Sequence, residues 1–403
     1  MKQLKQSTLL IITLLACINT SSKAQTDQSN LLGQINTVTT AVPFLMISPD
    51  GRAGGMGDAG VSSTPDANSM HWNPAKYAFI EKKSGFAVSY TPWLKALVND
   101  MFIGYLSGYT KIKKDQVLAG SLRYFSLGSI TFTDASGNVI RDFKPNEFAL
   151  DVCYSRKLSE NFSGGFALRY IHSNLTGGTE VQGTGDTKAG NSVAADISVY
   201  YQKEVEIGSK DAIFSSGLNI SNIGAKISYS ETGTKNFLPT NLRLGPSLKL
   251  NLNEYNTLGF SLDFNKLLVP TPPIYDQDST TGQDIIIYGE DPNVSVATGI
   301  FQSFSDAPNG FSEELQEVNI GFGMEYVYDK QFAFRGGYFY ENKNKGNRQY
   351  FTLGAGLRYN VFGLDLAYLI PTDQRNPLEN TLHFTLTFDF DGLGKKDADN
   401  NEE

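Results

Sequence analysis

The stretch Gln349–Asn360 reads QYFTLGAGLRYN, and its side chains alternate in character from one residue to the next. The odd-numbered positions, such as Phe351 and Leu353, are mostly apolar, whereas the even-numbered positions are mostly small or polar, as at Arg358. A period of two residues predicts a β-strand with one apolar and one polar face. The run is long enough for a tilted membrane-spanning strand of roughly 9–11 residues, and strands of soluble sandwiches are usually shorter.

The same alternation recurs on both sides of this stretch and predicts fourteen strands. Their expected ranges are 85–91, 100–109, 116–127, 146–158, 161–173, 191–203, 211–222, 238–252, 255–267, 317–328, 331–341, 347–360, 363–370 and 380–390. The connections after every second strand are short, and most of the others are long. Short turns opposite long loops, with an even strand count, are typical of outer-membrane barrels. We therefore predict an all-β fold, a transmembrane antiparallel β-barrel of about 14 strands over residues 85–390.

The N-terminal residues 1–24 are predicted to be a signal peptide. Lys2 and Lys5 precede the apolar run Leu9–Ile18, and small residues precede an expected cleavage after Ala24. These are the parts of a secretory signal peptide. The alternative is lipoprotein processing at Cys17, although Leu-Leu-Ala before it is a poor match for a lipoprotein signal. No later apolar run reaches the ~20 residues of a membrane helix, so we expect an exported chain that is either soluble or an outer-membrane barrel.

Composition excludes several classes of function. The 403 residues carry a formal charge of −8, which argues against a nucleic-acid partner. Two Cys and three dispersed His support neither a disulfide scaffold nor a zinc site. Asp276, Asp278 and Asp284 could bind Ca²⁺, but their spacing does not fit the EF-hand loop. We expect no catalytic residues, no enzyme activity, no cofactor and no metal.

Residues 25–84 differ from the strands and are predicted to form an N-terminal plug or hatch segment. Residues 48–60, SPDGRAGGMGDAG, are rich in Gly, which permits tight turns and close packing inside a barrel. The string Gly55-x-Gly57-x-x-Gly60 matches the dinucleotide fingerprint, but no strand–helix unit surrounds it, so we favour the structural interpretation. The residues that define this segment are Arg52, Gly55, Gly57, Asn73 and Pro74.

Charged residues on the expected inward faces are balanced, with six of each sign. A conducting pore more naturally carries a ring of one sign, so the balance favours a filled interior. Residues at equal distances from a tight turn face each other, and opposite charges there stabilise pairing by about 0.2–1 kcal/mol. We therefore predict three inward-pointing pairs, Asp151 with Arg169, Glu325 with Arg335, and Arg358 with Asp365.

The connection 268–316 is the longest in the chain and far exceeds the ~12–15 residues usual for an unstructured loop. One interpretation is a lid folded over the barrel mouth. The other is a partner-binding surface, since apolar patches on a rigid scaffold mark interaction sites. The apolar candidates are Ile286, Tyr288, Ile300, Phe301 and Phe304. The last residues, 391–403, are predicted to be an acidic disordered tail.

Two sets of motifs resemble a known family. Arg52-x-x-Gly55-Met56-Gly57-x-Ala59, followed by Asn73-Pro74-Ala75, resembles the N-terminal region of the FadL-like outer-membrane barrels. Gly299–Glu317 and Arg335–Asn360 look more specifically like the PorV family, the barrels of the type IX secretion system of Bacteroidetes. The regions Pro43–Gly60 and Tyr90–Trp93 also resemble that family, although this chain continues thirteen residues beyond Phe390, where many barrels end.

The resemblance implies a non-enzymatic barrel of the cell outer membrane, in contact with lipid. Such a protein receives secreted cargo, through the C-terminal signal domain of the cargo, at a SprA-type translocon. It passes the cargo to a PorU-type sortase and attachment complex at the cell surface. The alternative is a FadL-like transporter of hydrophobic small molecules.

Overall fold

The computed structural model describes residues 35–95, 98, 100–133, 136–178, 187–230, 233, 235–278, 282–373 and 376–391. These residues all belong to one structural unit, Ile35–Glu403. The predicted signal peptide and all but the first residue of the predicted acidic tail lie outside the described residues.

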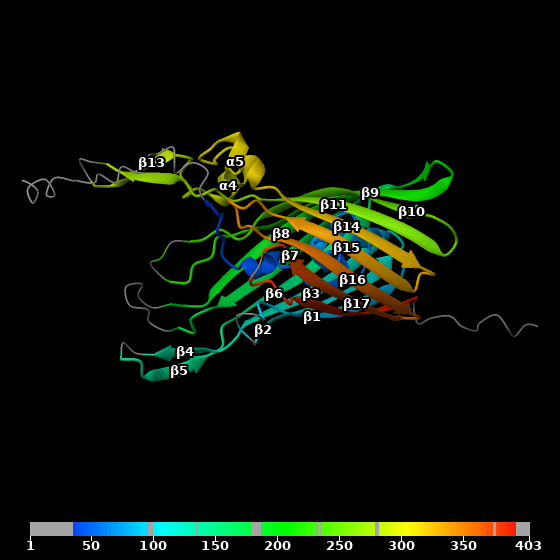
Figure 1. The fold of residues 1–403 in the computed structure, drawn as a ribbon, viewed down its shortest axis with the longest axis horizontal. Helices are drawn as coiled ribbons and strands as arrows, with labels where there is room; N and C mark the ends of the chain where they lie inside the picture. The colour runs from blue at the N-terminus through cyan, green and yellow to red at the C-terminus, as the bar shows by residue number, and fades with distance from the viewer. Residues whose placement is uncertain are drawn as a thin grey trace, which may run out of the picture. The chain divides into compact units, whose positions relative to one another are not determined.

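Within the described residues, fourteen strands form a closed antiparallel barrel (Figure 1). They are β1 (Ser84–Pro92), β2 (Met101–Lys113), β3 (Gln116–Leu127), β6 (Asn146–Lys157), β7 (Phe162–Asn174), β8 (Gly190–Ile207), β9 (Lys210–Gly224), β10 (Asn241–Asn251), β11 (Asn256–Leu267), β14 (Asn319–Tyr328), β15 (Phe332–Tyr340), β16 (Gln349–Tyr359), β17 (Phe362–Pro371) and β18 (Leu382–Phe390). Each strand pairs with its neighbours along the chain, and β1 closes the barrel against β18. The predicted barrel is confirmed.

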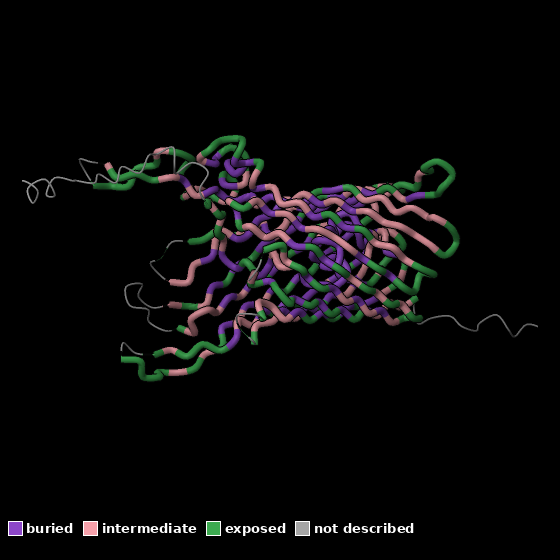
Figure 2. The backbone as a smooth tube through the Cα atoms, viewed as in Figure 1, coloured by how far each residue is buried: buried purple, intermediate pink, exposed green. Residues whose placement is uncertain are grey.

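Burial alternates along the barrel strands with the period that the sequence predicts. On β6, Asp151 and Cys153 are buried, whereas Leu150 and Val152 between them are exposed. Figure 2 shows this alternation of buried and exposed positions around the barrel wall. Because the exposed positions are apolar and the buried ones small or polar, the outer face suits lipid and the inner face suits contact with water or with polar protein groups.

Six further elements lie in the long connections. Two short hairpins pair β4 (Ile130–Thr133) with β5 (Val139–Phe143), and β12 (Ile274–Gln277) with β13 (Asp284–Tyr288). Helices α4 (Val296–Gln302) and α5 (Phe311–Gln316) follow the second hairpin. These elements lie at the same end of the barrel in Figure 1, the end where the long connections join the strands. Among the described residues, no helix is long and apolar enough to cross a bilayer.

Residues 41–80, which we call the luminal segment, pack against the inner faces of the barrel strands. They contain η2 (Pro43–Met46), α2 (Gly51–Gly54), α3 (Ser69–Trp72) and η3 (Pro74–Phe79), and nearly every residue is buried. Their apolar side chains join two clusters with the strands: Phe44 packs with Ile103 and Phe125 near one end, and Tyr77 packs with Val117 and Tyr109. The barrel core is therefore made by two parts of the chain that are distant in sequence.

Candidate functional site

Arg52 fastens the luminal segment to the barrel wall. The carboxylate of Asp50 accepts hydrogen bonds from the backbone N–H groups of Arg52 and Ala53, which fixes the first turn of α2. The Arg52 guanidinium then donates to Glu325 on β14 at 3.1 and 2.9 Å and to Asp66 at 2.8 Å. Burial alone would lower the pKa of Arg52, but the two carboxylates outweigh it and raise that pKa well above its ordinary value.

Two glycines allow the luminal segment to touch the backbone of the wall. Gly57 has a φ of +62°, and a Cβ added there would lie 2.6 Å from backbone atoms of Phe322 and Tyr338. Its N–H donates to the Thr352 hydroxyl at 2.9 Å. A Cβ added at Gly55 would lie 3.1 Å from the Cα atom of Gly354. Any larger residue at Gly57 would therefore both strain the backbone and push the segment away from β14 and β15.

Asn73 and Pro74 hold the other half of the luminal segment. The Asn73 amide donates to the carbonyls of Val61 and Val199 at 3.0 Å each, and its oxygen accepts from the N–H of Ala75. Pro74 begins η3, where the missing N–H of proline has no cost. The segment is thus tied both to itself and to β8.

Buried charges elsewhere in the luminal segment also have partners. Lys76 is fully buried and donates to the Gly60 carbonyl at 2.8 Å and the Ser63 hydroxyl at 3.0 Å. Burial lowers the pKa of Lys76 to about 8. Asp50 accepts from the Trp72 indole at 2.6 Å, and burial, followed by the nearby charge of Asp66, raises the pKa of Asp50 to about 6. The largest cause of both shifts is the removal of a charge from water.

The structure brings together the members of all three predicted charge pairs. Their shortest separations are 2.5 Å for Arg169 and Asp151, 2.7 Å for Arg335 and Glu325, and 2.6 Å for Arg358 and Asp365. Asp151 lies directly opposite Arg169, and Glu325 directly opposite Arg335. In these two hairpins the turn sets the register in the way that the sequence spacing predicts.

The predicted direct opposition of Arg358 and Asp365 is wrong. Arg358 lies opposite Gly363, and Asp365 lies opposite Gly356, so the two charges are diagonal neighbours on one face. The cause is a tight two-residue turn in which Asn360 adopts a φ of +54°, a conformation that Asn tolerates. The long Arg358 side chain spans the extra distance, and the ion pair forms despite the shift.

Two of the pairs, Glu325 with Arg335 and Arg358 with Asp365, join into a larger network that the sequence did not reveal. Arg335 contacts both Glu325 and Asp365, at 2.7 and 2.8 Å. Since Glu325 also contacts Arg52, opposite charges alternate in an unbroken series from the luminal segment across the wall. In order, its members are Asp66, Arg52, Glu325, Arg335, Asp365 and Arg358. The contacts of Arg52 with Glu325 and of Arg335 with Asp365 join residues that are not related by a single turn. Counting residues about a turn therefore cannot predict them.

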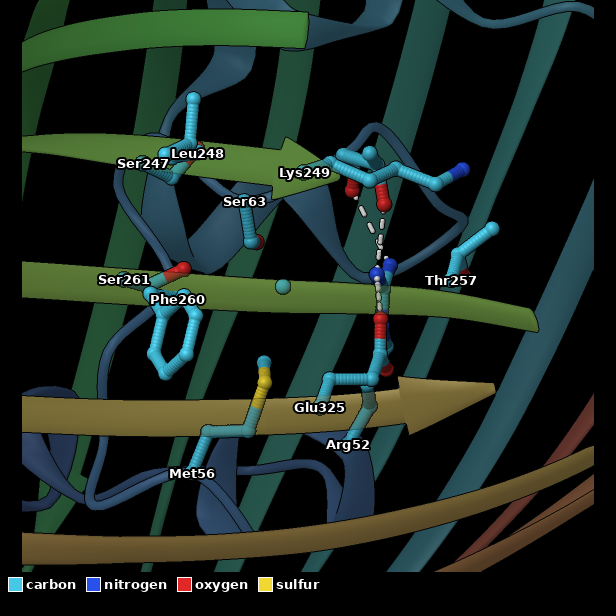
Figure 3. Close-up of a pocket in the computed structure, with 12 residues that line it drawn as sticks. Arg52, Met56, Ser63, Ser247, Leu248, Lys249, Thr257, Phe260, Ser261 and Glu325 are labelled. Atoms are coloured by element: carbon cyan, nitrogen blue, oxygen red, sulfur yellow. Dashed lines mark hydrogen bonds and ion pairs between the residues drawn. The ribbon is translucent and has the colours of Figure 1, made fainter. Parts of the chain in front are cut away.

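A small pocket remains beside this network (Figure 3). It has a volume of about 30 Å³ and is lined by Arg52, Met56, Lys249, Phe260 and Glu325, among others. A cavity of this size holds a water molecule or two, whereas small-molecule sites usually measure roughly 300–1,000 Å³. The pocket does not accommodate an organic solute in this conformation.

The structure gives no support to a metal centre in the part of the chain that it describes. No cluster of three or more His, Cys, Asp or Glu there is arranged to hold an ion. Asp276 and Asp284 are both exposed on the β12–β13 hairpin. Cys153 and His383 point inward and are almost fully buried.

Residues 268–316, which we call the arm, have a buried ionic base. Lys266, at the end of β11, contacts Glu314 at 2.8 Å and Glu317 at 2.6 Å. Lys345, in the connection between β15 and β16, contacts Glu313 at 2.6 Å and Glu317 at 2.9 Å. Each of these side chains is at most 9% exposed. Sequence reasoning missed this cluster, which fixes α5 to the barrel rim.

The outer part of the arm exposes most of its predicted apolar residues. Phe301 is 78% exposed and Phe304 is 49% exposed, and Ile286 and Tyr288 are also exposed. Ile300 is partly buried. Two further residues of α5, Phe311 and Leu315, are exposed and were not predicted. Of the five predicted partner-binding residues, four are therefore exposed and Ile300 is partly buried.

Comparison with known proteins identifies one matching family. The sequence matches the family model described as type IX secretion system protein PorV over residues 30–274, more than half of the chain. No curated protein sequence matches significantly.

Several solved structures share the architecture at low sequence identity. The Pseudomonas putida toluene transporter TodX is 11% identical, with a TM-score of 0.45 over 88% of this chain and 98% of its own. The Ralstonia pickettii toluene transporter TbuX is 9% identical, with a TM-score of 0.46 over 85% and 98% of the two chains. A Pseudomonas aeruginosa FadL homologue is 13% identical, with a TM-score of 0.40 over 88% and 99%. These are likenesses of fold, and they carry no argument about function.

Proposed function

Because this chain belongs to the PorV family of type IX secretion system proteins, we propose that it is a non-enzymatic outer-membrane component of protein secretion. It receives secreted cargo, through the C-terminal signal domain of the cargo, at a SprA-type translocon. It then passes the cargo to a PorU-type sortase and attachment complex at the cell surface. The protein reaches the outer membrane by means of the signal peptide in residues 1–24.

The packing of the luminal segment against the inner faces of the strands best supports this function over transport through the barrel. The luminal segment is held by the ionic series that includes Arg52, Glu325 and Arg335, and the adjoining pocket measures about 30 Å³. Removing one member of a buried ion pair costs about 3–5 kcal/mol, so the segment resists displacement. We propose that the segment acts as a permanent plug and that the protein works at its external surface.

The arm is the proposed working surface for partners. Its base is fixed to the rim through Lys266 and Lys345, while Phe301 and Phe304 remain exposed beyond it. Exposed aromatic residues on a fixed scaffold are typical of protein interaction sites, because their shape is set before the partner arrives. The exposure of these two side chains supports a partner-binding surface over a lid that would cover them.

Purification from native outer membrane tests this function. A tagged full-length chain should co-purify with the translocon and with cargo. A variant lacking residues 283–304 should form a heat-resistant barrel but lose both partners and cargo secretion. The matched control removes residues 130–143, the β4–β5 hairpin and its turn, and should retain them. Deletion of the whole gene provides the contrary result. If it leaves cargo secretion normal, or if its sole effect is a loss of uptake of hydrophobic solutes, the FadL-like transporter is favoured instead.

A further inference from the structure

The β12–β13 hairpin is a two-stranded sheet with no third strand. Asp276 pairs with Ile285 and Gln277 with Asp284, and no other described strand joins either edge. Isolated two-stranded hairpins are marginally stable in water, and a third strand stabilises them by adding backbone hydrogen bonds and side-chain burial. The hairpin lies beyond the ends of the barrel strands, where such a strand can approach it (Figure 1).

The two strands are short, carry Asp276 and Asp284, and have a β-bulge between Ile274 and Tyr275, but two other features that commonly protect an edge are absent. Proteins commonly guard exposed edges with Lys or Pro, and neither residue occurs in β12 (IYDQ) or β13 (DIIIY). Instead Tyr275 is 49% exposed and Ile285 is 46% exposed, with Ile286 and Tyr288 also exposed. Exposed apolar side chains along an open strand offer contacts to the side chains of an added strand.

The charge of the arm selects the kind of strand that would pair with it. No Lys or Arg occurs between Lys266 and Lys330. Lys266 is already engaged by Glu314 and Glu317 at the base of the arm. The acidic residues in or beside the hairpin are Asp276, Asp278, Asp284, Glu290 and Asp291. A surface of one sign attracts segments of the opposite sign and repels a second copy of itself.

The β4–β5 hairpin provides an internal contrast. Its Arg141 guanidinium lies over the rings of Phe132 and Phe143, 5.3 and 5.4 Å from their centroids. The same group donates to the carbonyls of Thr176 and Gly177 at 2.9 and 3.2 Å, which ties this hairpin to the next loop. The β4–β5 hairpin is therefore held by a cation of its own, Arg141, which also contacts the next loop. The strands of the β12–β13 hairpin contain no Lys or Arg.

We propose that the open edge of β13 binds an extended segment of secreted cargo in which apolar and basic residues alternate. The segment pairs with β13 as a third strand, so that main-chain hydrogen bonds give affinity and the acidic residues of the arm select Lys or Arg. This inference rests on the proposed function in secretion, and it adds the recognition element and the chemistry of the recognised strand.

Photocrosslinking in secreting cells tests the proposal with the full-length chain. A benzoylphenylalanine replaces Ile286, and a matched probe replaces Val139, which is exposed on β5. The probe at 286 should give an adduct whose mapped peptide is a cargo segment of alternating apolar and basic residues. The double substitution Asp276→Lys/Asp284→Lys should lower the adduct yield about tenfold, because it replaces attraction by repulsion. The control Asp142→Lys on β5 should leave the yield unchanged.

Each other outcome overturns the inference. An adduct only with the translocon, an adduct only with a second copy, no adduct, or a yield unaffected by charge reversal assigns the hairpin another role or none. Heat-resistant migration of every variant shows that the barrel is folded. If these results occur while deletion of the whole gene still abolishes secretion, the proposed function stands and the recognition element is wrong. If deletion of the gene leaves secretion normal, the proposed function itself fails.

Discussion

The luminal segment and the arm are both rich in charged and apolar residues, but they use them in opposite ways. In the lumen, Arg52 and Lys76 are buried, and they donate hydrogen bonds to carboxylates, carbonyls and hydroxyls. In the described part of the arm, the ion pairs lie at the base, and the outer part leaves Phe301 exposed. Charged side chains that are paired inside the barrel hold the structure together. Apolar side chains that stay exposed on the arm provide a surface for other molecules.

Removing Arg52 should have the largest effect on the lumen side of this contrast. Arg52→Met leaves Asp66 and Glu325 without their shared cation, and breaking such a buried pair costs about 3–5 kcal/mol. We expect a lower free energy of unfolding in lipid vesicles and protease cleavage within residues 41–80. The double variant Arg52→Met/Glu325→Gln should recover part of the loss. An unchanged unfolding free energy would show that the luminal segment is not held by this network.

Two exposed phenylalanines separate a lipid-facing surface from a water-facing one. Phe322 on β14 is 44% exposed, and Phe301 on α4 is 78% exposed. Phe322→Arg should destabilise the barrel by about 2–4 kcal/mol if it lies near the bilayer midplane. Phe301→Arg should change stability by no more than about 0.5 kcal/mol. Urea unfolding in vesicles measures both, and equal costs would remove the distinction between the two surfaces.

The base of the arm should respond locally, without affecting the barrel. Lys266→Met leaves the buried carboxylates of Glu314 and Glu317 short of one cation, at a cost of about 1–3 kcal/mol. We expect faster proteolysis of residues 268–316 and an unchanged unfolding transition of the barrel. Lys330→Met, a substitution in an exposed turn, serves as the control. A cooperative loss of barrel stability would mean that arm and barrel unfold together.

The smallest expected effect is a pH dependence at the same base. Burial, helped by the charges of Glu314 and Glu317 and opposed by the hydrogen bond from the Thr271 N–H, raises the pKa of Asp306 to about 6. A carboxyl whose pKa is higher in the folded than in the unfolded chain contributes stability when it is protonated. That contribution is complete below the unfolded pKa of 3.8 and is lost as the pH rises through about 6. The arm should therefore be cleaved more slowly at pH 5 than at pH 7.5, after correction for protease activity. Asp306→Asn should abolish the difference.

Local periodicity made most of the barrel predictable, because lipid on one side and protein on the other impose alternation on every strand. The register of Asp151 with Arg169 followed from counting residues about one turn. Contacts across the lumen did not follow, since Arg52 and Glu325 are 273 residues apart and meet only after the barrel closes. The β12–β13 hairpin was missed because four or five residues are too few to show a period.

A reversible lock on the luminal segment tests most directly whether the barrel works while filled. A Cβ placed at Gly55 lies 3.5 Å from the Cβ of Ala367 on β17, within the range of a disulfide. The single variant Gly55→Cys, whose Cβ lies 3.1 Å from the Cα of Gly354, is the control and should secrete cargo normally. In the variant Gly55→Cys/Ala367→Cys, secretion of cargo should be the same with the bond oxidised and with it reduced. Secretion that stops on oxidation and returns with reductant would show that the segment must move, and would contradict the account.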